Sequence, residues 1–287
     1  MLSFLMPPGQ SVPLEIKPFE EMGAVARASA PHRHSFYAIF HVTGGRGTHV
    51  VDFKSHPIRP PALWFISPRQ VHSWDTTAPL RGQVLPFTEE FLRVTAGADS
   101  GMRELAFFHD LEGASELRLS AAANQDISAV LQALADEYGS AALNREPALR
   151  AWLQLLLIKA QRLYATQKPR PAATATAALA RKFIQLVTEQ FIQERSVPVY
   201  ARQIGVSTGH LHDLVKQGTG LTPQQIIRRE LVLEAKRLLA HTELTIAEIS
   251  YRLAMEDPAY FGRFFKRETG RTPGAFRKRI REKHQSV

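Results

Sequence analysis

The chain contains no cysteine among its 287 residues. Disulfide bridges, thiolate metal sites and cysteine nucleophiles are therefore excluded as sources of stability or chemistry. A chain without disulfides fits the reducing environment of the cytoplasm, where we expect this protein to act.

Long apolar runs are also missing. No run approaches the roughly 20 residues that a membrane-spanning helix needs, and the N-terminus lacks the basic segment and apolar stretch of a signal peptide. The formal net charge is +9, and +8 of it falls after residue 178, where 19 basic and 11 acidic side chains occur. A solvated surface can carry such a charge, but its concentration in the last third favours contact with a polyanion such as DNA.

The first 115 residues contain short apolar runs that glycine and proline interrupt, for example residues 36–42, 47–53 and 62–66. Short strands at this spacing predict an antiparallel sandwich or barrel. Helical periodicity begins after about residue 120 and predicts helices over residues 126–138 and 146–164. The second helix is apolar around most of its circumference, which predicts either packing within its own domain or contact with a second subunit as well.

The stretch 167–177 holds two prolines and no large apolar residue, which is typical of a linker. We therefore expect a first domain over residues 1–165, a linker over 166–178 and a second domain over 179–287.

A motif occurs twice in the second domain, 50 residues apart. It reads Lys216-Gln-Gly-Thr-Gly220-Leu-Thr222-Pro223 and then Lys266-Arg-Glu-Thr-Gly270-Arg-Thr272-Pro273. Each copy is predicted to lie at the end of a helix-turn-helix unit. Ser207 and Asp257 are expected to N-cap the second helix of each unit. Gly218 and Gly220 are expected to end the second helix of the first unit. A helix from a capping box at Thr222 to about residue 240 would hold the two units about one DNA turn apart.

These residues give the second domain a clear resemblance. It resembles the DNA-binding domain of the AraC/XylS family of bacterial transcription regulators over roughly 100 residues. The matching positions are Ala201, Ile204-Gly-Val-Ser207, Leu211, Lys216, Gly220, Thr222-Pro223, Ala235-Lys-Arg-Leu-Leu239, Ile246, Ile249, Tyr260-Phe261, Phe264-Phe265-Lys266, Gly270 and Thr272-Pro273. One departure is Ala254-Met255, where such proteins usually carry Gly-Phe in the turn before the second recognition helix.

The resemblance also implies which residues meet DNA. It places Gly209, His212, Asp213, Pro258, Ala259 and Arg263 at base-facing positions. Arg263 suits guanine, because a guanidinium can bind its O6 and N7 together, although a phosphate contact or a surface ion pair is the alternative. We expect phosphate contacts from Lys216, Lys266 and Arg267, and packing rather than base stacking from the row of phenylalanines on the second helix.

The first domain has its densest chemistry in histidines and aromatic residues. The pattern His32-x-His34, Gly47 and Pro68-x-x-x-His72 resembles the cupin-like sensor domains that precede such DNA-binding modules. The resemblance implies a ligand at the mouth of a small barrel. The candidate ligand-binding residues are His32, His34, Tyr37, Arg46, Trp64 and His72.

Three interpretations of this cluster stay open. It can be a pocket for a small anionic or aromatic metabolite, a three-histidine metal site without the glutamate that metal-binding cupins usually add, or a purely structural group. We expect the first, and so no metal, no cofactor and no catalytic residue.

The fold class expected is α+β with two domains, a cupin-like β-barrel with a helical dimerisation segment and an all-α domain with two helix-turn-helix units. The function expected is that of a sequence-specific DNA-binding transcription regulator modulated by a small molecule. The expected partners are double-stranded DNA, the effector, a second copy of the chain and, for an activator, RNA polymerase. The alternatives are a metal-dependent cupin-type enzyme and a DNA-binding protein without an effector.

Overall fold

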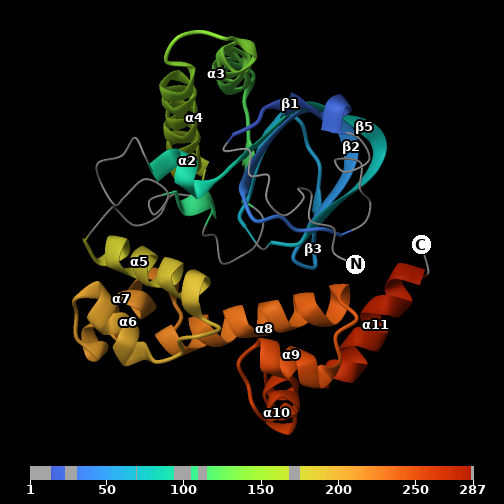
Figure 1. Ribbon diagram of the computed structural model, residues 1–287, viewed down its shortest axis with the longest axis vertical. Helices are drawn as coiled ribbons and strands as arrows, with labels where there is room; N and C mark the ends of the chain where they lie inside the picture. Colours follow the sequence, from blue (N-terminus) through green and yellow to red (C-terminus); the bar gives the residue numbers. More distant parts are fainter. Residues whose placement is uncertain are drawn as a thin grey trace. The chain divides into compact units, whose positions relative to one another are not determined.

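The computed structural model describes residues 14–22, 31–68, 70–93, 105–108, 115–167 and 175–285. The chain divides into two compact units, and the boundary between them follows the helix that ends at Gln167. The first unit is built on an antiparallel sheet and the second is helical (Figure 1). The expected fold class, an antiparallel β domain followed by an all-α domain, is confirmed. No helix in the described part of the chain is long and apolar enough to cross a membrane.

The sheet of the first unit has the strand order β1-β5-β2-β4-β6, with β3 paired to β2. Its strands are β1 (Lys17–Pro18), β2 (Tyr37–Val51), β3 (Lys54–Pro57), β4 (Ala62–Ile66), β5 (His72–Phe87) and β6 (Ser115–Arg118). The long strands β2 and β5 pair along most of their length, with register shifts between Val42 and Gly47. Short helical turns flank the sheet: η1 (Phe19–Met22), α2 (Glu89–Arg93) and η2 (Ala106–Phe108).

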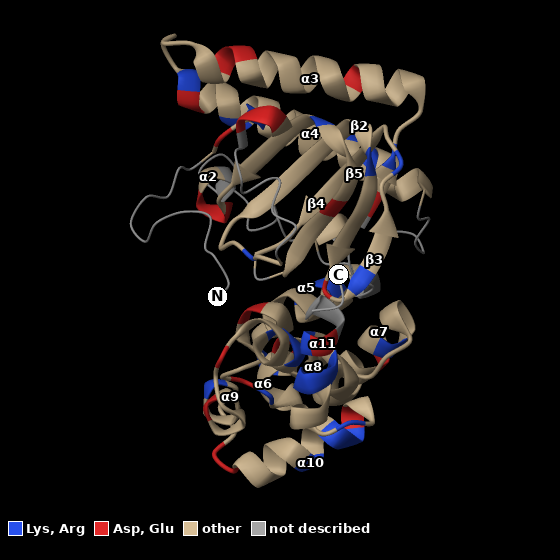
Figure 2. Ribbon diagram, turned by 90° about the vertical axis from the view of Figure 1, so that its right-hand side faces the viewer, with Lys and Arg blue, Asp and Glu red and all other residues tan. Residues whose placement is uncertain are grey.

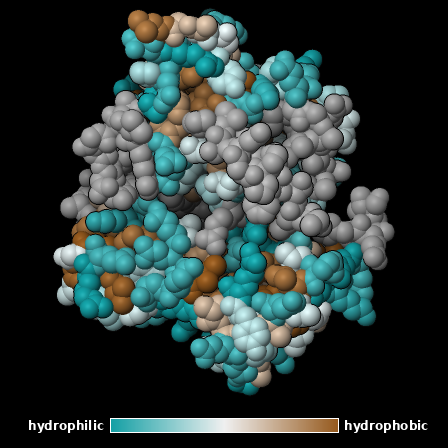
Figure 3. All heavy atoms as spheres, viewed as in Figure 1, coloured by the Kyte–Doolittle hydropathy of each residue, from teal (hydrophilic) through white to brown (hydrophobic). Residues whose placement is uncertain are grey.

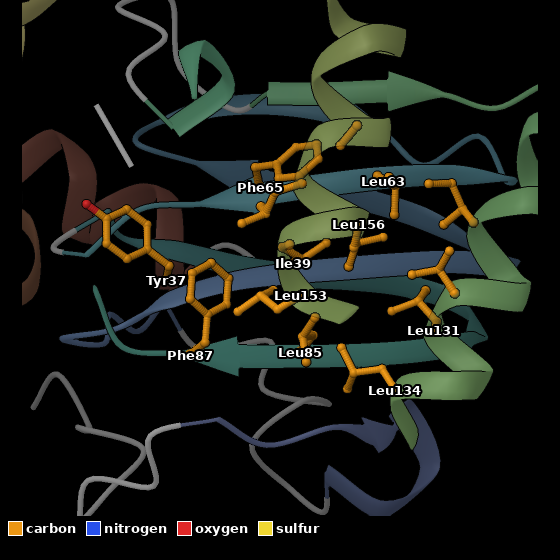
Figure 4. Packing of buried hydrophobic residues seen from close by; sticks show 14 of the residues in the cluster. Tyr37, Ile39, Leu63, Phe65, Leu85, Phe87, Leu131, Leu134, Leu153 and Leu156 are labelled. Carbon is orange, nitrogen blue, oxygen red and sulfur yellow. The ribbon is translucent and has the colours of Figure 1, made fainter. Parts of the chain in front are cut away.

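Alternation along the strands gives the sheet two apolar faces. On one face Ile39, Phe65 and Leu85 pack against two helices, α3 (Ala121–Gly139) and α4 (Arg145–Gln167) (Figure 4). The other face carries a separate buried cluster, which includes Phe40 and Trp64. One face of the sheet therefore packs against the helices, and the other face contributes to a second hydrophobic core.

One close approach between β2 and β5 requires glycine. Gly82 has φ +129°, and a Cβ there would lie 1.8 Å from the carbonyl oxygen of His41. No L side chain fits this backbone conformation and spacing. Gly82 thus allows the two strands to stay paired next to the register shifts.

The second unit consists of seven helices in its described part. They are α5 (Ala175–Gln190), α6 (Val197–Ile204), α7 (Thr208–Thr219), α8 (Pro223–His241), α9 (Ile246–Arg252), α10 (Pro258–Thr269) and α11 (Pro273–Gln285). Figure 1 shows α6 and α7 at one end of α8, with α9 and α10 toward the other. Thr222 forms the predicted capping box with Gln225, and Pro223 occupies the first turn of α8.

Helices α4 and α5 overlap the two ends of the linker that was expected over residues 166–178. Its first two residues lie in α4 and its last four in α5, while residues 168–174 are outside the described part of the chain. The prediction that Gly218 ends α7 is wrong. Gly218 lies within the helix, because only Gly220 takes the left-handed conformation, at φ +73°, that turns the chain away.

Candidate nucleic-acid interface and effector site

Helices α6 and α7 form the first helix-turn-helix unit. Gly205 ends α6 in the left-handed conformation at φ +83°, and the Ser207 side chain accepts the N–H of His210 to cap α7. The predicted N-cap Ser207 is confirmed. Both features orient α7 through local backbone chemistry.

Helices α9 and α10 form the second unit with a different turn. Ala254 supplies the left-handed residue, at φ +49°, and the N–H of Met255 donates to the carbonyl of Ser250 at 2.9 Å. Ala254 lies three positions before the N-cap Asp257, whereas Gly205 lies two positions before Ser207. Alanine adopts this conformation at a cost of about 1–2 kcal/mol, so the second turn is strained where the first is not.

Arg195 holds this strained turn from outside the unit. Its guanidinium donates to the carbonyl oxygens of Leu253 and Ala254, at 3.2 Å for the latter. The C-terminal carbonyls of a helix otherwise lack partners, so a cation there stabilises the helix end. The segment before α6 is thereby tied to the turn that precedes α10.

The candidate DNA-binding residues of α7 lie on its outer side. Gly209 and Lys216 are exposed, and the side chains of His212 and Asp213 are 41% and 86% exposed. His212 and Asp213 lie 3.9 Å apart through Nδ1 and Oδ1. Leu211, Leu214 and Val215 are buried on the opposite side, so α7 presents one polar face to solvent.

Helix α10 repeats this arrangement. Phe261, Phe264 and Phe265 are buried, as expected, while Ala259 and Lys266 are exposed and Pro258 is half-buried at the first position of the helix. The Arg267 guanidinium pairs with Glu268 and lies over the Phe264 ring, 5.7 Å from its centroid. It is therefore less free to reach DNA than Lys266.

Arg263 is the most prominent polar group on α10. Its side chain is 70% exposed, and its Nη2 lies 3.5 Å from Oδ2 of Asp257, whose Oδ1 accepts the N–H of Ala259. One carboxylate thus caps the helix and orients the arginine. Basic residues also line α8 and α11 (Figure 2).

In the first unit, the structure brings three candidate histidines and a tryptophan together beneath the sheet. His32, His34, His72 and Trp64 are at most 5% exposed. The His32 and His72 backbones exchange hydrogen bonds at 2.8 and 2.9 Å, which closes the segment before β2 onto β5. The ring centroids of His32 and His34 lie 4.3 and 5.3 Å from that of His72.

Two residues outside the six candidate ligand-binding residues, His49 and Trp74, also belong to this cluster. His49 lies flat against Trp74, with ring centroids 3.6 Å apart, and its Nε2 is 3.1 Å from Nδ1 of His72. The two residues are cross-strand partners on β2 and β5. The sequence shows that His49 and Trp74 are present in this domain. It does not show the strand register that pairs them.

Two candidate residues lie elsewhere. Tyr37 packs with Phe87 and Phe108 on the helix-facing side, because Tyr37 and Phe40 are three residues apart on one strand and point to opposite faces. Arg46 is exposed in the bulged part of β2. Neither side chain joins the buried histidines, and the cluster has no cation from Arg46.

Burial keeps the imidazoles of His34, His49 and His72 neutral. Loss of hydration lowers the pKa of His34 to about 4 and holds the pKa values of His49 and His72 well below 6.5, with His32 and the other histidines adding to the effect. Among the described residues, no group of three or more His, Asp or Glu side chains has the geometry of a metal site.

These features define a class of protein, namely a DNA-binding transcription regulator with a separate sensor domain. Residues 20–156 match the model of the AraC-like ligand-binding domain, and residues 200–279 match a helix-turn-helix domain. The transcriptional activator RhaR of Klebsiella pneumoniae is 30% identical over 258 residues, which cover 88% of each chain. RhaR of an Enterobacter species is 28% identical over 88% of each chain, and RhaS of Salmonella schwarzengrund is 26% identical over 93% and 92%.

This chain belongs to the AraC family of transcription regulators. Among solved structures, it is similar to ToxT of Vibrio cholerae bound to an unsaturated fatty acid. That likeness covers 92% of this chain and 94% of ToxT, at 13% identity and a TM-score of 0.42.

Proposed function

We propose that this protein is a cytoplasmic transcription activator that binds a promoter through both helix-turn-helix units and acts with RNA polymerase. The observation that supports it most is the pairing of two similarly capped second helices, α7 and α10, on either side of α8. The 19 residues of α8 span about 28 Å at 1.5 Å per residue. That length is close to the ~34 Å between successive major grooves on one side of DNA.

The exposure and charge of the candidate residues indicate which of them contact bases and which contact phosphates. Arg263 reads a guanine, with Asp257 holding its guanidinium, and His212, Asp213, Gly209, Pro258 and Ala259 lie against base edges. Lys216, Lys266 and Arg267 contact phosphates.

Replacement of Arg263 by alanine tests this division, with Lys266→Ala as the matched control on the same helix. Loss of a bidentate base contact should cost about 1–3 kcal/mol of binding free energy and relax the preference at one base pair. Lys266→Ala should weaken all sequences alike and reduce the salt dependence. Quantitative binding to a library of single-base variants distinguishes the two, and equal weakening of every sequence by Arg263→Ala would assign Arg263 to a phosphate instead.

We further propose that the chain is a homodimer formed through α3 and α4. This helical pair exposes Leu143, 92% accessible at the α3–α4 loop, and Ile158, 38% accessible on α4 (Figure 3 shows the hydrophobic patch at the loop). Ile158→Glu should lower the mass measured by sedimentation equilibrium, whereas Gln154→Glu, one turn earlier on α4, should not. An unchanged mass for Ile158→Glu would place the dimer contact elsewhere.

We also propose that the N-terminal domain binds a small effector at the buried histidine cluster. Effector binding then changes DNA binding by the second unit. The proposed domains are 1–165 and 179–287 with the segment between them as the connection. The effector can shift DNA binding only by as much as its affinity differs between the two states of the protein.

A further inference from the structure

Every backbone polar group of the turn before α10 has a hydrogen-bond partner. The N–H groups of Leu253, Ala254 and Met255 donate to carbonyl oxygens of α9, at 2.9 to 3.0 Å. The carbonyl oxygen of Met255 accepts the Ser250 hydroxyl at 2.7 Å. The two remaining carbonyls, those of Leu253 and Ala254, accept the guanidinium of Arg195, which lies 58 positions before Leu253 in the sequence. Arg195 therefore completes the hydrogen bonding of a turn that belongs to the other helix-turn-helix unit.

Ala254 is the residue of this turn that needs support. The side chains of Leu253 and Met255 are buried, whereas Ala254 is exposed and connects them at φ +49°. Alanine leaves this left-handed conformation readily, because its Cβ crowds the following carbonyl oxygen. One nitrogen of Arg195, Nη2, donates to both carbonyls. These charge-assisted bonds favour the backbone conformation that presents both oxygens to a single cation.

Arg195 is itself held in the first helix-turn-helix unit. It lies one position before Ser196, the N-cap of α6. The preceding residue, Glu194, accepts the Tyr200 hydroxyl through its carbonyl at 2.9 Å and the Ser196 N–H through its side chain at 2.6 Å. Burial lowers the pKa of the Arg195 guanidinium, so the group is partly withdrawn from solvent. The bonds to the turn thus start from a fixed point beside α6.

The same turn determines where α10 begins. Asp257, three positions after Ala254, caps α10 through Oδ1 and lies 3.5 Å from Nη2 of Arg263 through Oδ2. A change of backbone angle at Ala254 therefore moves the cap, the helix and Arg263 together. A guanidinium reads guanine only when its N–H groups reach O6 and N7 at once, so a small displacement of α10 is enough to lose that contact.

We propose that Arg195 is a positioning residue for base recognition by the second unit. From its place before α6, it holds Ala254 in the left-handed conformation and so sets where α10 meets the bases. This inference rests on the proposed function, in which α7 and α10 read one DNA site, and it adds a connection between the two units besides α8. Arg195 itself contacts neither a base nor a phosphate.

Replacement of Arg195 by alanine tests the proposal, with the full chain and a library of single-base variants of the DNA that the parent protein selects. Without its bonds to Arg195 the turn should leave the left-handed conformation, which alanine disfavours by about tenfold. The affinity falls by the same factor, since only the left-handed fraction is competent to bind. Base preference should weaken in the block read by α10 and persist in the block read by α7. The dependence of affinity on salt should stay the same.

Two outcomes of this experiment overturn the proposal. Equal weakening of every sequence by Arg195→Ala, with a smaller salt dependence, would assign Arg195 to a phosphate. Full base preference in both blocks would leave α10 independent of Arg195. Arg252→Ala, which removes an exposed cation of α9 beside the same turn, is the matched control and should keep the base preference of both blocks.

A second substitution separates positioning from a general loss of stability. Glycine adopts the left-handed conformation without strain, so Ala254→Gly in the Arg195→Ala background should restore most of the affinity and of the second-block preference. Ala254→Gly alone should change neither. Arg195→Lys keeps the charge but not the planar donor group; it should show a smaller loss of the same kind, and it carries the test if the alanine variant fails to fold. Absence of rescue by glycine contradicts the proposal.

Backbone chemical shifts of the free protein measure the turn without DNA. Arg195→Ala should move the signals of residues 253–259 and leave those of α7 in place, and Ala254→Gly in that background should return the signals of residues 255–259. Unchanged signals in Arg195→Ala overturn the proposal. If the parent selects a motif with one block, the two-unit function fails, and these shifts still decide the role of Arg195. If the parent selects two blocks and Arg195→Ala keeps both, the function stands and the positioning role fails.

Discussion

Acidification should selectively destabilise the N-terminal unit, because its buried histidines are neutral when folded. His34 has a pKa of about 4 in the folded chain and about 6.5 when unfolded. Between these values the unfolded chain binds a proton that the folded chain does not, so stability is full above pH 6.5 and falls as the pH approaches 4. His49 and His72 act in the same direction, since burial lowers their pKa values too.

The effect of His34 alone can be sized. Each pH unit in this window removes up to about 1.4 kcal/mol of unfolding free energy per histidine. From pH 7 to pH 5, protonation of the unfolded chain at His34 should therefore cost about 2 kcal/mol. Most carboxylates titrate below this range, so the window reports mainly on histidine.

Tryptophan fluorescence isolates the relevant unit. The three tryptophans of the chain are Trp64, Trp74 and Trp152, and all lie in the N-terminal unit. Urea unfolding followed by fluorescence at pH 7, 6 and 5 gives the free energy of that unit. His34→Asn, which cannot titrate, should flatten the dependence by about 2 kcal/mol, and an identical pH dependence in parent and variant would refute the reasoning.

Two further predictions concern the backbone. Ala254→Gly should change stability by less than about 0.5 kcal/mol or increase it, because relief of left-handed strain offsets the greater freedom of the unfolded chain. Ala178→Gly, at an exposed site in α5, should cost about 1 kcal/mol; equal losses in urea unfolding followed by circular dichroism would argue against strain at Ala254. Gly82→Ala should destabilise the sheet by about 3 kcal/mol or more, since its Cβ would meet the His41 carbonyl. Gly139→Ala, with nothing within 4 Å of its Cβ, should be neutral or stabilising, and similar behaviour of the two alanine variants would rule out the steric explanation.

Features set by neighbouring residues were predictable from the sequence. The caps Ser207, Thr222 and Asp257 act on backbone groups within three residues of themselves, so their roles follow from residue type and position. Gly218 was misplaced because two glycines in three positions compete to end α7, and only the three-dimensional course of the chain selects Gly220.

Which residues form the histidine cluster could not be predicted from neighbouring residues in the sequence. The register shifts between Val42 and Gly47 change the parity of β2, so His49 faces the same interior as Phe40 although their positions differ by an odd number. Before the shifts, Tyr37 points the other way by ordinary alternation. Contact between His32, His49 and His72 also depends on three segments pairing at a distance, which no local pattern specifies.

The central claim is that two helix-turn-helix units read one DNA site together. Selection of random genomic fragments with the full chain at physiological salt, followed by sequencing, tests it most directly. The account predicts a shared motif with two conserved blocks about 10 base pairs apart. Arg263→Ala should weaken the base preference in only one of these blocks. Binding that depends on salt but selects no motif, or a motif with a single block, would contradict it.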